Sequence, residues 1–226
     1  TTVVPSVLTT AGAFAGYFDW GPVDKVKLID NEINLRSTFG TPSNDSYVEF
    51  FTCANFLSYG NNLNVVRSAN TLMYNATSNN LIQIKNEDVF EATLLNQNNT
   101  NLYGPFMARY PGEYGNSLSV YMCANTSLFS GWSYANYFTS APTTSTFVSQ
   151  AGGANDEMHI VVVDSGGLFS GTVGTVLETY PFISKASDAI NSDGSSNYYK
   201  QVIFNNSKYI YAVDPADYAN TVATWN

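Results

Sequence analysis

The sequence predicts an α+β fold, with a mixed sheet joined by crossover helices and a small inserted domain. Three observations predict it. Apolar runs of strand length alternate with amphipathic helical stretches over 11–70. The order strand, helix, strand there requires a crossover, which makes neighbouring strands parallel. An Asn-rich stretch at 71–109 then interrupts the strand-like runs. We therefore expect an N-terminal arm or linker at 1–10, a discontinuous main domain at 11–70 and 110–226, and a small inserted lobe at 71–109.

The first elements follow from local patterning. Residues 11–19 alternate small and aromatic side chains, which suits a central strand with close backbone approach. The corner Trp20-Gly21-Pro22 ends this strand. Lys25–Ile29 alternates charged and apolar residues and predicts a half-buried strand. A short helix over 31–38 should then end at Phe39-Gly40, where glycine suits a helix C-terminus.

The clearest helix follows Pro42 and ends before Gly60. Its apolar residues recur at helical spacing and predict one buried stripe. The members of this stripe are Tyr47, Phe50, Phe51, Ala54 and Leu57. Gly60 stands where a left-handed helix cap is expected. A strand over 63–69 follows it.

The pattern of the second half of the chain predicts strands separated by long polar segments. The turn-forming residues Tyr110–Asn116 precede a strand, and 126–155, rich in Ser, Thr and Tyr, predicts an exposed loop region. Two apolar runs separated by glycines predict a hairpin. The expected elements are a helix at 87–95, strands at 118–124, 158–164 and 174–183, a short helix at 197–205 and a last strand at 208–213.

Composition excludes several classes of protein. The 226 residues are 44% hydrophobic, which is enough for a globular core, and only 12% charged. The net charge is −9 and no basic run occurs, so we expect no nucleic-acid partner. No apolar stretch approaches the ~18 residues that a membrane span needs, so we expect no membrane partner. Because the first residue is Thr1, we expect a processed or trimmed piece of a longer protein.

Residues that carry chemistry are few and scattered. Cys53 and Cys123 predict two buried free thiols, and a single histidine makes a zinc site improbable. His159 lies inside a strand-like run, so we expect a sheet residue that faces solvent or forms hydrogen bonds. The chain has no Gly-x-Ser-x-Gly elbow that would support a serine hydrolase. The carboxylate pairs Asp156-Glu157 and Asp19/Asp24 predict solvated edges or turns rather than a glycosidase site. No phosphate-binding loop occurs. We therefore expect neither a metal nor another cofactor.

Several motifs occur in a fixed order along the chain. They are Phe14–Asp19, Trp20-Gly21-Pro22, Phe39-Gly40, a helix end containing Tyr59-Gly60, the strand Val65-Val66-Arg67, and Tyr110-Pro111-Gly112-Glu113-Tyr114-Gly115-Asn116 before another strand. With these motifs the chain resembles the tail sheath proteins of contractile-tailed phages, especially the T-even-like myoviruses. The resemblance is tight over 12–67 and 110–121, looser over 157–214 and absent over 71–109.

The resemblance implies a mechanical subunit without a cofactor. Such subunits form hexameric rings, stacked helically around a tail tube, and contract on a baseplate signal to drive the tube through the host envelope. The family's C-terminal contact domain is missing here, so we expect this chain alone to be monomeric. The resemblance also implies a place in the virion after assembly in the host bacterial cytoplasm.

We expect structural roles for several of the motif residues. Trp20 should plug the core, Gly21 should permit an unusual backbone angle and Pro22 should fix the turn. Arg67 is expected either as a surface or strand-end charge, or in an ion pair between subunits or domains.

Two other classes of function stay open on the sequence. Sixteen tyrosines, fourteen phenylalanines and a low charge also suit a secreted or cell-surface, adhesin-like binding module. The ordered motifs favour the sheath interpretation, whereas a signal peptide upstream would favour the adhesin. An enzyme ranks third, because it would depend on His159 as its only histidine.

Overall fold

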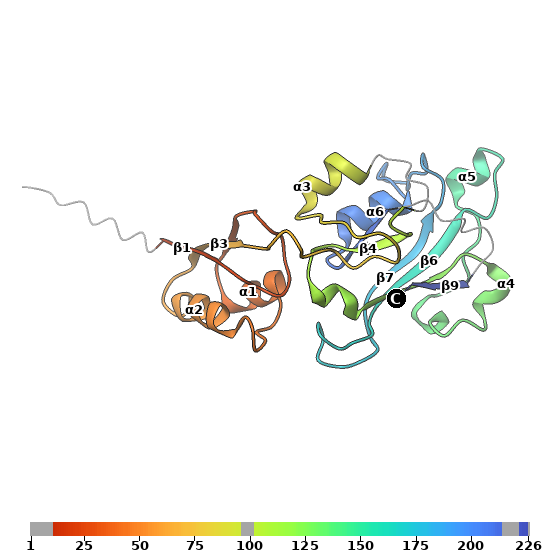
Figure 1. Cartoon of the computed structure of the whole chain (residues 1–226). Helices are drawn as coiled ribbons and strands as arrows, with labels where there is room; N and C mark the ends of the chain where they lie inside the picture. Colours follow the sequence, from red (N-terminus) through yellow and green to blue (C-terminus); the bar gives the residue numbers. More distant parts are fainter. Residues whose placement is uncertain (1–10, 96–101, 214–221, 226) are drawn as a thin grey trace, which may run out of the picture. The chain divides into compact units, whose positions relative to one another are not determined.

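The computed structural model describes residues 11–95 and 102–213, together with the backbone of 222–225. The predicted N-terminal arm, 1–10, lies outside the described residues. The chain is α+β, as the sequence predicts, and divides into two compact units, 1–73 and 74–226. Figure 1 labels their helices and strands. No helix within the described ranges is both long and apolar enough to cross a lipid bilayer.

The first unit is a three-stranded mixed sheet with two helices. Its elements are β1 (Ala11–Gly16), β2 (Lys27–Ile29), α1 (Glu32–Phe39), α2 (Tyr47–Leu57) and β3 (Asn62–Arg67). β1 and β3 are parallel, which confirms the predicted crossover, and β2 pairs antiparallel with β3. The strand order is β1-β3-β2, so β1 is an edge strand and the prediction of a central strand is wrong. β3, with its alternating buried Leu63, Val65 and Arg67, takes the centre.

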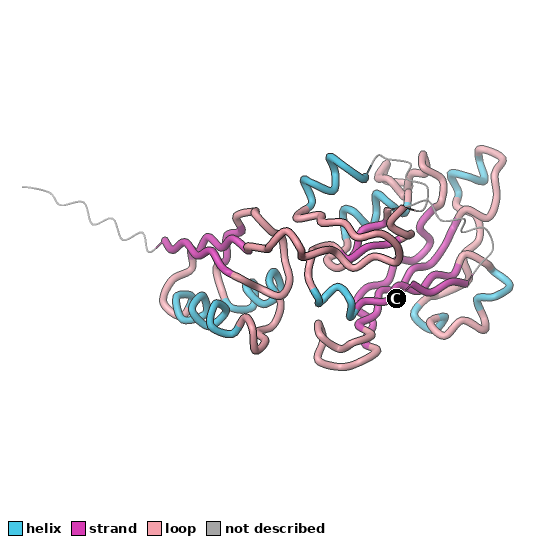
Figure 2. The backbone as a smooth tube through the Cα atoms, viewed as in Figure 1, coloured by secondary structure: helices cyan, strands magenta, loops and turns pink. Residues whose placement is uncertain are grey.

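The core of the first unit lies on one face of this sheet, the face that α1 and α2 cover (Figure 2). Phe14 of β1 packs against this core, while its neighbours Ala13 and Ala15 are exposed. The core is built from Phe18, Ile29, Leu35, Phe39, Phe50, Cys53, Leu63 and Val65. The sheet is therefore covered on one face by its own helices, while Ala13 and Ala15 of β1 and Leu28 of β2 are exposed.

The buried side of α2 differs from the predicted stripe. Phe50 and Cys53 are buried, but the side chains of Tyr47 and Phe51 are 53% and 50% exposed. α2 carries apolar residues over most of its circumference, so spacing alone did not fix which of them face the sheet. Ala54 and Leu57 of the predicted stripe pack against the core as expected, whereas Tyr47 and Phe51 remain on the surface of the unit.

The second unit contains two sheets. β4 (Phe106–Ala108) pairs with β8 (Ile210–Ala212), and a four-stranded antiparallel sheet has the order β7-β6-β5-β9. Its strands are β5 (Leu118–Cys123), β6 (Glu157–Asp164), β7 (Thr175–Ser184) and β9 (Val222–Trp225). The β6–β7 pairing confirms the predicted hairpin. The strand predicted to be last, now β8, is followed by β9, so that prediction is wrong.

Short helices surround these sheets. They are α3 (Glu87–Phe90), which continues into the π-helix η1 (Glu91–Leu95), the 3₁₀ helices η2 (Glu113–Ser117) and η3 (Ala135–Tyr137), α4 (Thr126–Phe129), α5 (Thr146–Gln150) and α6 (Tyr199–Asn206). The helices predicted at 87–95 and 197–205 are thus present. The predicted loop region 126–155 instead contains α4, η3 and α5, because Trp132 and its aromatic neighbours pack onto the sheet.

The division of the chain also differs from the prediction. The stretch 71–109 does not form a lobe of its own, because Phe90 and Leu94 share a core with Tyr211 and Val213 near the other end of the chain. The β4–β8 pairing joins the same two segments. The boundary falls at 73/74, so 74–109 belongs with 110–226 and the segment 11–70 forms its own unit. A stretch this short rarely buries enough surface to form a core by itself, so it needs a distant partner.

Both cysteines are buried free thiols, as the sequence predicts. Cys53 lies in the core of the first unit and Cys123 in that of the second. Burial raises the pKa of the Cys53 thiol to about 12, and the nearby Glu49 adds to the effect. Burial also raises the pKa of Cys123. Both groups stay protonated at neutral pH and pack as small apolar side chains.

Candidate structural site: a buried arginine and its turn

Arg67 is the organising side chain of the first unit. It ends β3, where strand alternation points it to the helix-covered face, and it is fully buried. Its guanidinium donates from Nε to the carbonyl of Phe18 at 2.7 Å and from Nη1 to that of Gly21 at 2.7 Å. Nη2 donates to the carbonyl of Asp19 at 3.3 Å. One side chain thus holds three carbonyls of the corner that follows β1.

The backbone of Arg67 contacts the same corner. The Arg67 carbonyl accepts the Asp24 N–H at 3.0 Å, and Val23 pairs with Arg67 in an isolated parallel β-bridge. A buried guanidinium is costly unless its donors are satisfied, and buried carbonyls are costly unless they find donors. In this site the guanidinium donors of Arg67 and the turn carbonyls satisfy one another. The fork of an arginine suits this arrangement, because several donors leave one rigid plane.

Gly21 is required by the same turn. Its φ is +99°, a region that glycine alone adopts at little cost. A Cβ on Gly21 would lie 2.5 Å from the carbonyl oxygen of Thr38 and 2.8 Å from the Phe39 ring. Both the backbone angle and the space therefore exclude a side chain. The turn is pressed directly against the end of α1.

The Phe39-Gly40 motif forms the other side of this contact. The Phe39 carbonyl accepts the Trp20 N–H at 3.3 Å, and the Phe39 ring stacks on Phe18 with centroids 4.7 Å apart. Gly40, with φ +87°, donates its N–H to the Arg36 carbonyl and closes α1 as predicted. Trp20 and Pro22 are both buried. The corner, the end of α1 and the end of β3 therefore form one packed site.

The carboxylate of Asp19 extends the site to α2. It accepts a hydrogen bond from the Ser46 hydroxyl, and Ser46 immediately precedes that helix. Asp19 and Ser46 are both buried. Burial raises the pKa of Tyr17, and the charge of Asp19 raises it further. The sequence predicted a solvated Asp19, and its burial corrects that prediction.

The second motif, Tyr110–Asn116, lies in the second unit. Gly112 has φ +129° and donates its N–H to the Tyr74 carbonyl at 2.9 Å. A Cβ on Gly115 would lie 2.6 Å from that of Ala108, so this glycine allows close packing. Tyr110 and Pro111 are buried, and β5 follows as predicted. A cavity of about 210 Å³ borders Gly115 and Asn116, and no charged side chain lines it.

Comparison with known proteins identifies relatives of this chain. The tail sheath protein of Salmonella phage ViI is 32% identical over 175 residues, which are 76% of this chain and 25% of that protein. The tail sheath protein of Enterobacteria phage T4 is 44% identical over 71 residues, which are 30% of this chain and 11% of that protein. The chain is homologous to phage tail sheath proteins.

The homology covers a limited part of those sheath proteins. The tail sheath protein of Vibrio phage KVP40 is 39% identical over 70 residues, 30% of this chain and 10% of that protein. The chain thus spans about a quarter of the ViI sheath protein that it matches and about a tenth of the other two. No family model matches the chain.

Structural comparison finds a sheath tail protein from Listeria innocua. It has a TM-score of 0.41 and 11% identity, and the match covers 96% of this chain and 35% of that one.

The structure brings together only some of the residues that the sheath resemblance singled out. Trp20, Gly21 and Pro22 meet the Phe39-Gly40 turn and Arg67. Tyr59 and Gly60 lie beyond the C-terminal end of α2, where Tyr59 is 72% exposed. The Tyr110–Asn116 motif belongs to the other unit. The sheath motifs thus mark at least two separate structural sites.

Two predictions about the sheath motifs need correction. Arg67 was expected as a surface charge or in an ion pair between subunits or domains, but it is an internal residue that holds turn carbonyls. Gly60 was expected in a left-handed cap, yet its φ is not positive. Its small size matters instead, because a Cβ there would lie 2.9 Å from the Phe56 ring.

Several residues that hold the second unit together could not be recognised from sequence patterns. Asp164 is fully buried, and its carboxylate accepts from the Ser117 hydroxyl and from the Ser170 N–H and hydroxyl. Asn75 donates its side-chain N–H to the carbonyls of Ile84 and Ala108 and accepts the Ile84 N–H. An aspartate at a strand end and an asparagine in an Asn-rich stretch have the pattern of ordinary turn residues. The sequence therefore did not indicate which groups they would bind.

His159 and Asp156 are also internal. His159 was expected to face solvent or to form hydrogen bonds; it is buried, lies 2.9 Å from the Ser140 carbonyl through Nε2, and accepts the Phe182 N–H at Nδ1. Burial lowers the pKa of this imidazole. Asp156, predicted to be solvated, is buried and accepts from the Ser184 hydroxyl and the Ser145 N–H. Over the described ranges, His, Cys, Asp and Glu side chains form no group of three or more suited to a metal.

Proposed function

We propose that this chain is part of a subunit of a contractile phage tail sheath, which contracts around a tail tube during genome delivery. The observation that carries the proposal is the 32% identity over 175 residues to a tail sheath protein. The second match, 44% identity to the T4 sheath protein over 71 residues, also supports it. The relatives are named for a structural role, so we propose that the chain is not an enzyme and needs no cofactor.

A contracting sheath needs subunits that keep their own shape while the contacts between copies change. The site around Arg67 supplies such rigidity, because one buried side chain fixes the corner between β1 and α1. Gly21 and Gly40 allow the backbone to close around it. We propose that the first unit moves as one body during contraction, and that the stored free energy lies in the interfaces between subunits.

Exposed apolar side chains of the first unit support a role in self-assembly. Within the described residues, more than half of the exposed large hydrophobic side chains lie in this smaller unit. They are Val26, Leu28, Ile33, Tyr47, Val48, Phe51, Tyr59 and Leu72. Burying one such side chain completely contributes about 1.5 to 3 kcal/mol. We propose that contacts between sheath subunits bury part of this surface.

The wider assembly follows from the same proposal. The intact sheath protein would form hexameric rings stacked helically around the tube and would respond to the baseplate. It would be assembled in the host bacterial cytoplasm and become part of the virion. By itself, the 226-residue chain should sediment as a monomer, because the proposal assigns the main contacts between subunits to sheath residues outside it.

The proposal is tested by electron microscopy of the complete polypeptide that contains this chain. We expect tubes after expression, and we expect Leu28→Asp, on the exposed surface of the first unit, to reduce their number. Leu168→Asp is the matched control, because Leu168 is also exposed but lies in a hairpin loop of the second unit. Isolated particles only, under all assembly conditions, would contradict the proposal. Equal effects of the two substitutions would exclude the first unit as the contact surface.

A further inference from the structure

One segment of the second unit combines aromatic rings with an absence of charged residues in its own sequence, and the carboxylate of Glu157 in β6 accepts from Thr143 at its edge. No Asp, Glu, Lys or Arg occurs between Glu113 and Asp156, although the chain carries 9 basic and 18 acidic residues elsewhere. The segment that follows β5 in this stretch covers one face of the four-stranded sheet. Most of its exposed side chains are neutral and polar. They include Ser127, Ser130, Ser133, Asn136, Thr139 and Ser140, all at least partly exposed.

Three tyrosines lie together among these polar groups, and we call them the tyrosine surface. Tyr137 is 56% exposed, and Tyr134 and Tyr121 are partly exposed. The Tyr121 and Tyr134 ring centroids are 4.6 Å apart, and those of Tyr134 and Tyr137 are 6.2 Å apart. Burial, followed by a hydrogen bond with Tyr121, raises the pKa of Tyr134 to about 12. That hydroxyl therefore stays uncharged at neutral pH.

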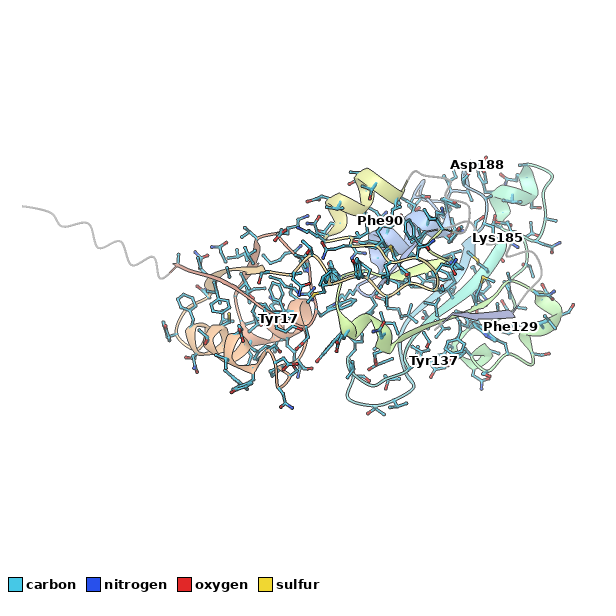
Figure 3. All side chains as sticks on the ribbon, viewed as in Figure 1. Tyr17, Phe90, Phe129, Tyr137, Lys185 and Asp188 are labelled. Carbon is cyan, nitrogen blue, oxygen red and sulfur yellow. The ribbon has the colours of Figure 1, made fainter. Side chains whose placement is uncertain are left out.

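The tyrosine surface rests on a rigid aromatic layer. Trp132 is 6% exposed and packs edge-on against Tyr134 with centroids 5.8 Å apart. Trp132 stacks on Phe138 at 5.5 Å, and Phe138 stacks on His159 of β6 at 4.2 Å. Figure 3 labels Tyr137 and Phe129, which belong to this same segment. Rings held in this way lose little side-chain entropy when a ligand binds.

We propose that the tyrosine surface binds an uncharged carbohydrate. A tyrosine ring offers an apolar face and a hydroxyl, which match the C–H face and the hydroxyls of a sugar ring. The surrounding Ser, Thr and Asn side chains supply further neutral donors and acceptors. The lack of any cation in the segment disfavours nucleic acids and anionic polysaccharides. Protein interfaces are also rich in tyrosine and poor in charge, but they are depleted of serine, whereas Ser127, Ser130 and Ser133 are all exposed here and Leu128 is the one large aliphatic side chain of the segment with high exposure.

Affinity electrophoresis of the 226-residue chain tests this inference. Native gels would contain dextran, yeast mannan or galactan as neutral probes, or alginate as an anionic control. We expect at least one neutral polysaccharide to retard the chain and alginate to leave its mobility unchanged. Tyr137→Ala should weaken the association about threefold to tenfold. Tyr59→Ala, which removes an exposed tyrosine from the first unit, should migrate like the wild type.

Three results would overturn the inference. The first is that no neutral polysaccharide changes the mobility of the chain. The second is that Tyr137→Ala is retarded as much as the wild type. The third is that alginate retards the chain as much as the neutral polysaccharides do. Near-ultraviolet circular dichroism of Tyr137→Ala verifies that the variant is folded. Sedimentation provides a further check, because self-association that Tyr137→Ala abolishes would assign the surface to contacts between copies instead. None of these results depends on the sheath proposal, which the formation of tubes tests separately.

Discussion

The two units of this chain are stabilised by different means. In the first, a buried guanidinium binds the carbonyls of a tight corner, and many apolar side chains remain outside. In the second, stacked aromatic rings cover one face of a sheet, and buried carboxylates accept from serines. The first unit thus has its own apolar core and still leaves other apolar side chains exposed. Its apolar surface is therefore left for contacts with other molecules.

Removing the arginine should have the largest effect. Arg67→Leu leaves three turn carbonyls without their donor and should destabilise the first unit by about 3 to 5 kcal/mol. Arg67→Lys should restore little, because one ammonium cannot reproduce the planar fork. Amide hydrogen exchange resolves the effect by element. Faster exchange in β3 with unchanged protection in β5 is expected, and equal loss in both strands would disprove the separation of the units.

A glycine comparison isolates the contact between the corner and α1. Gly21→Ala combines a positive φ with a clash against the Thr38 carbonyl and should cost about 2 to 3 kcal/mol. Gly174→Ala also has a positive φ, +82°, but no atom lies within 4 Å of the position that its methyl group would take, so about 1 kcal/mol is expected. Thermal denaturation of both variants measures the difference. Equal costs would show that the corner relaxes away from the helix.

In the second unit, the buried carboxylate of Asp164 holds a turn by several hydrogen bonds, as Arg67 does in the first unit. Asp164→Asn places an amide donor opposite the donors of Ser117, Phe169 and Ser170, and should cost about 2 kcal/mol. Although burial by itself raises the pKa of Asp164, the hydrogen bonds from Ser117 and Ser170 hold it below its usual value. The folded form therefore favours the charged carboxylate, and this stabilisation is lost as the pH falls through the folded pKa. Urea denaturation at neutral and acidic pH measures the free energy of unfolding. Acid should lower this free energy less in the variant than in the wild type. An equal loss in both proteins would exclude a stabilising role for the charged Asp164 carboxylate.

The smallest predicted effect concerns His159. Burial lowers its pKa, so the unfolded chain binds a proton at a higher pH than the folded chain does. Stability of the second unit should consequently fall as the pH drops below the ordinary histidine value of about 6.5. His159→Gln can still accept from Phe182 and donate to Ser140, and it should flatten this dependence. A wild type whose β6 amides are equally protected at pH 7.5 and 5.5 would contradict the prediction.

Sequence patterning predicted the local elements better than their partners. The crossover between β1 and β3, the β6–β7 hairpin and the helix at 87–95 follow from periodicity and turn residues. The pairing of β4 with β8 joins residues about a hundred positions apart, and local patterns carry no information on it. The candidate site was found in part, because Trp20-Gly21-Pro22 is a visible corner. The burial of Arg67 was missed, since a charged residue at a strand end usually faces solvent.

The place of the chain in a phage particle tests the central claim most directly. Immunogold electron microscopy with antibodies against this chain should be carried out on virions of the phage that encodes it. The sheath proposal predicts gold particles along the whole length of the contractile tail, in extended and contracted tails alike. Labelling confined to fibre tips, or found only on host cells outside any particle, would contradict it.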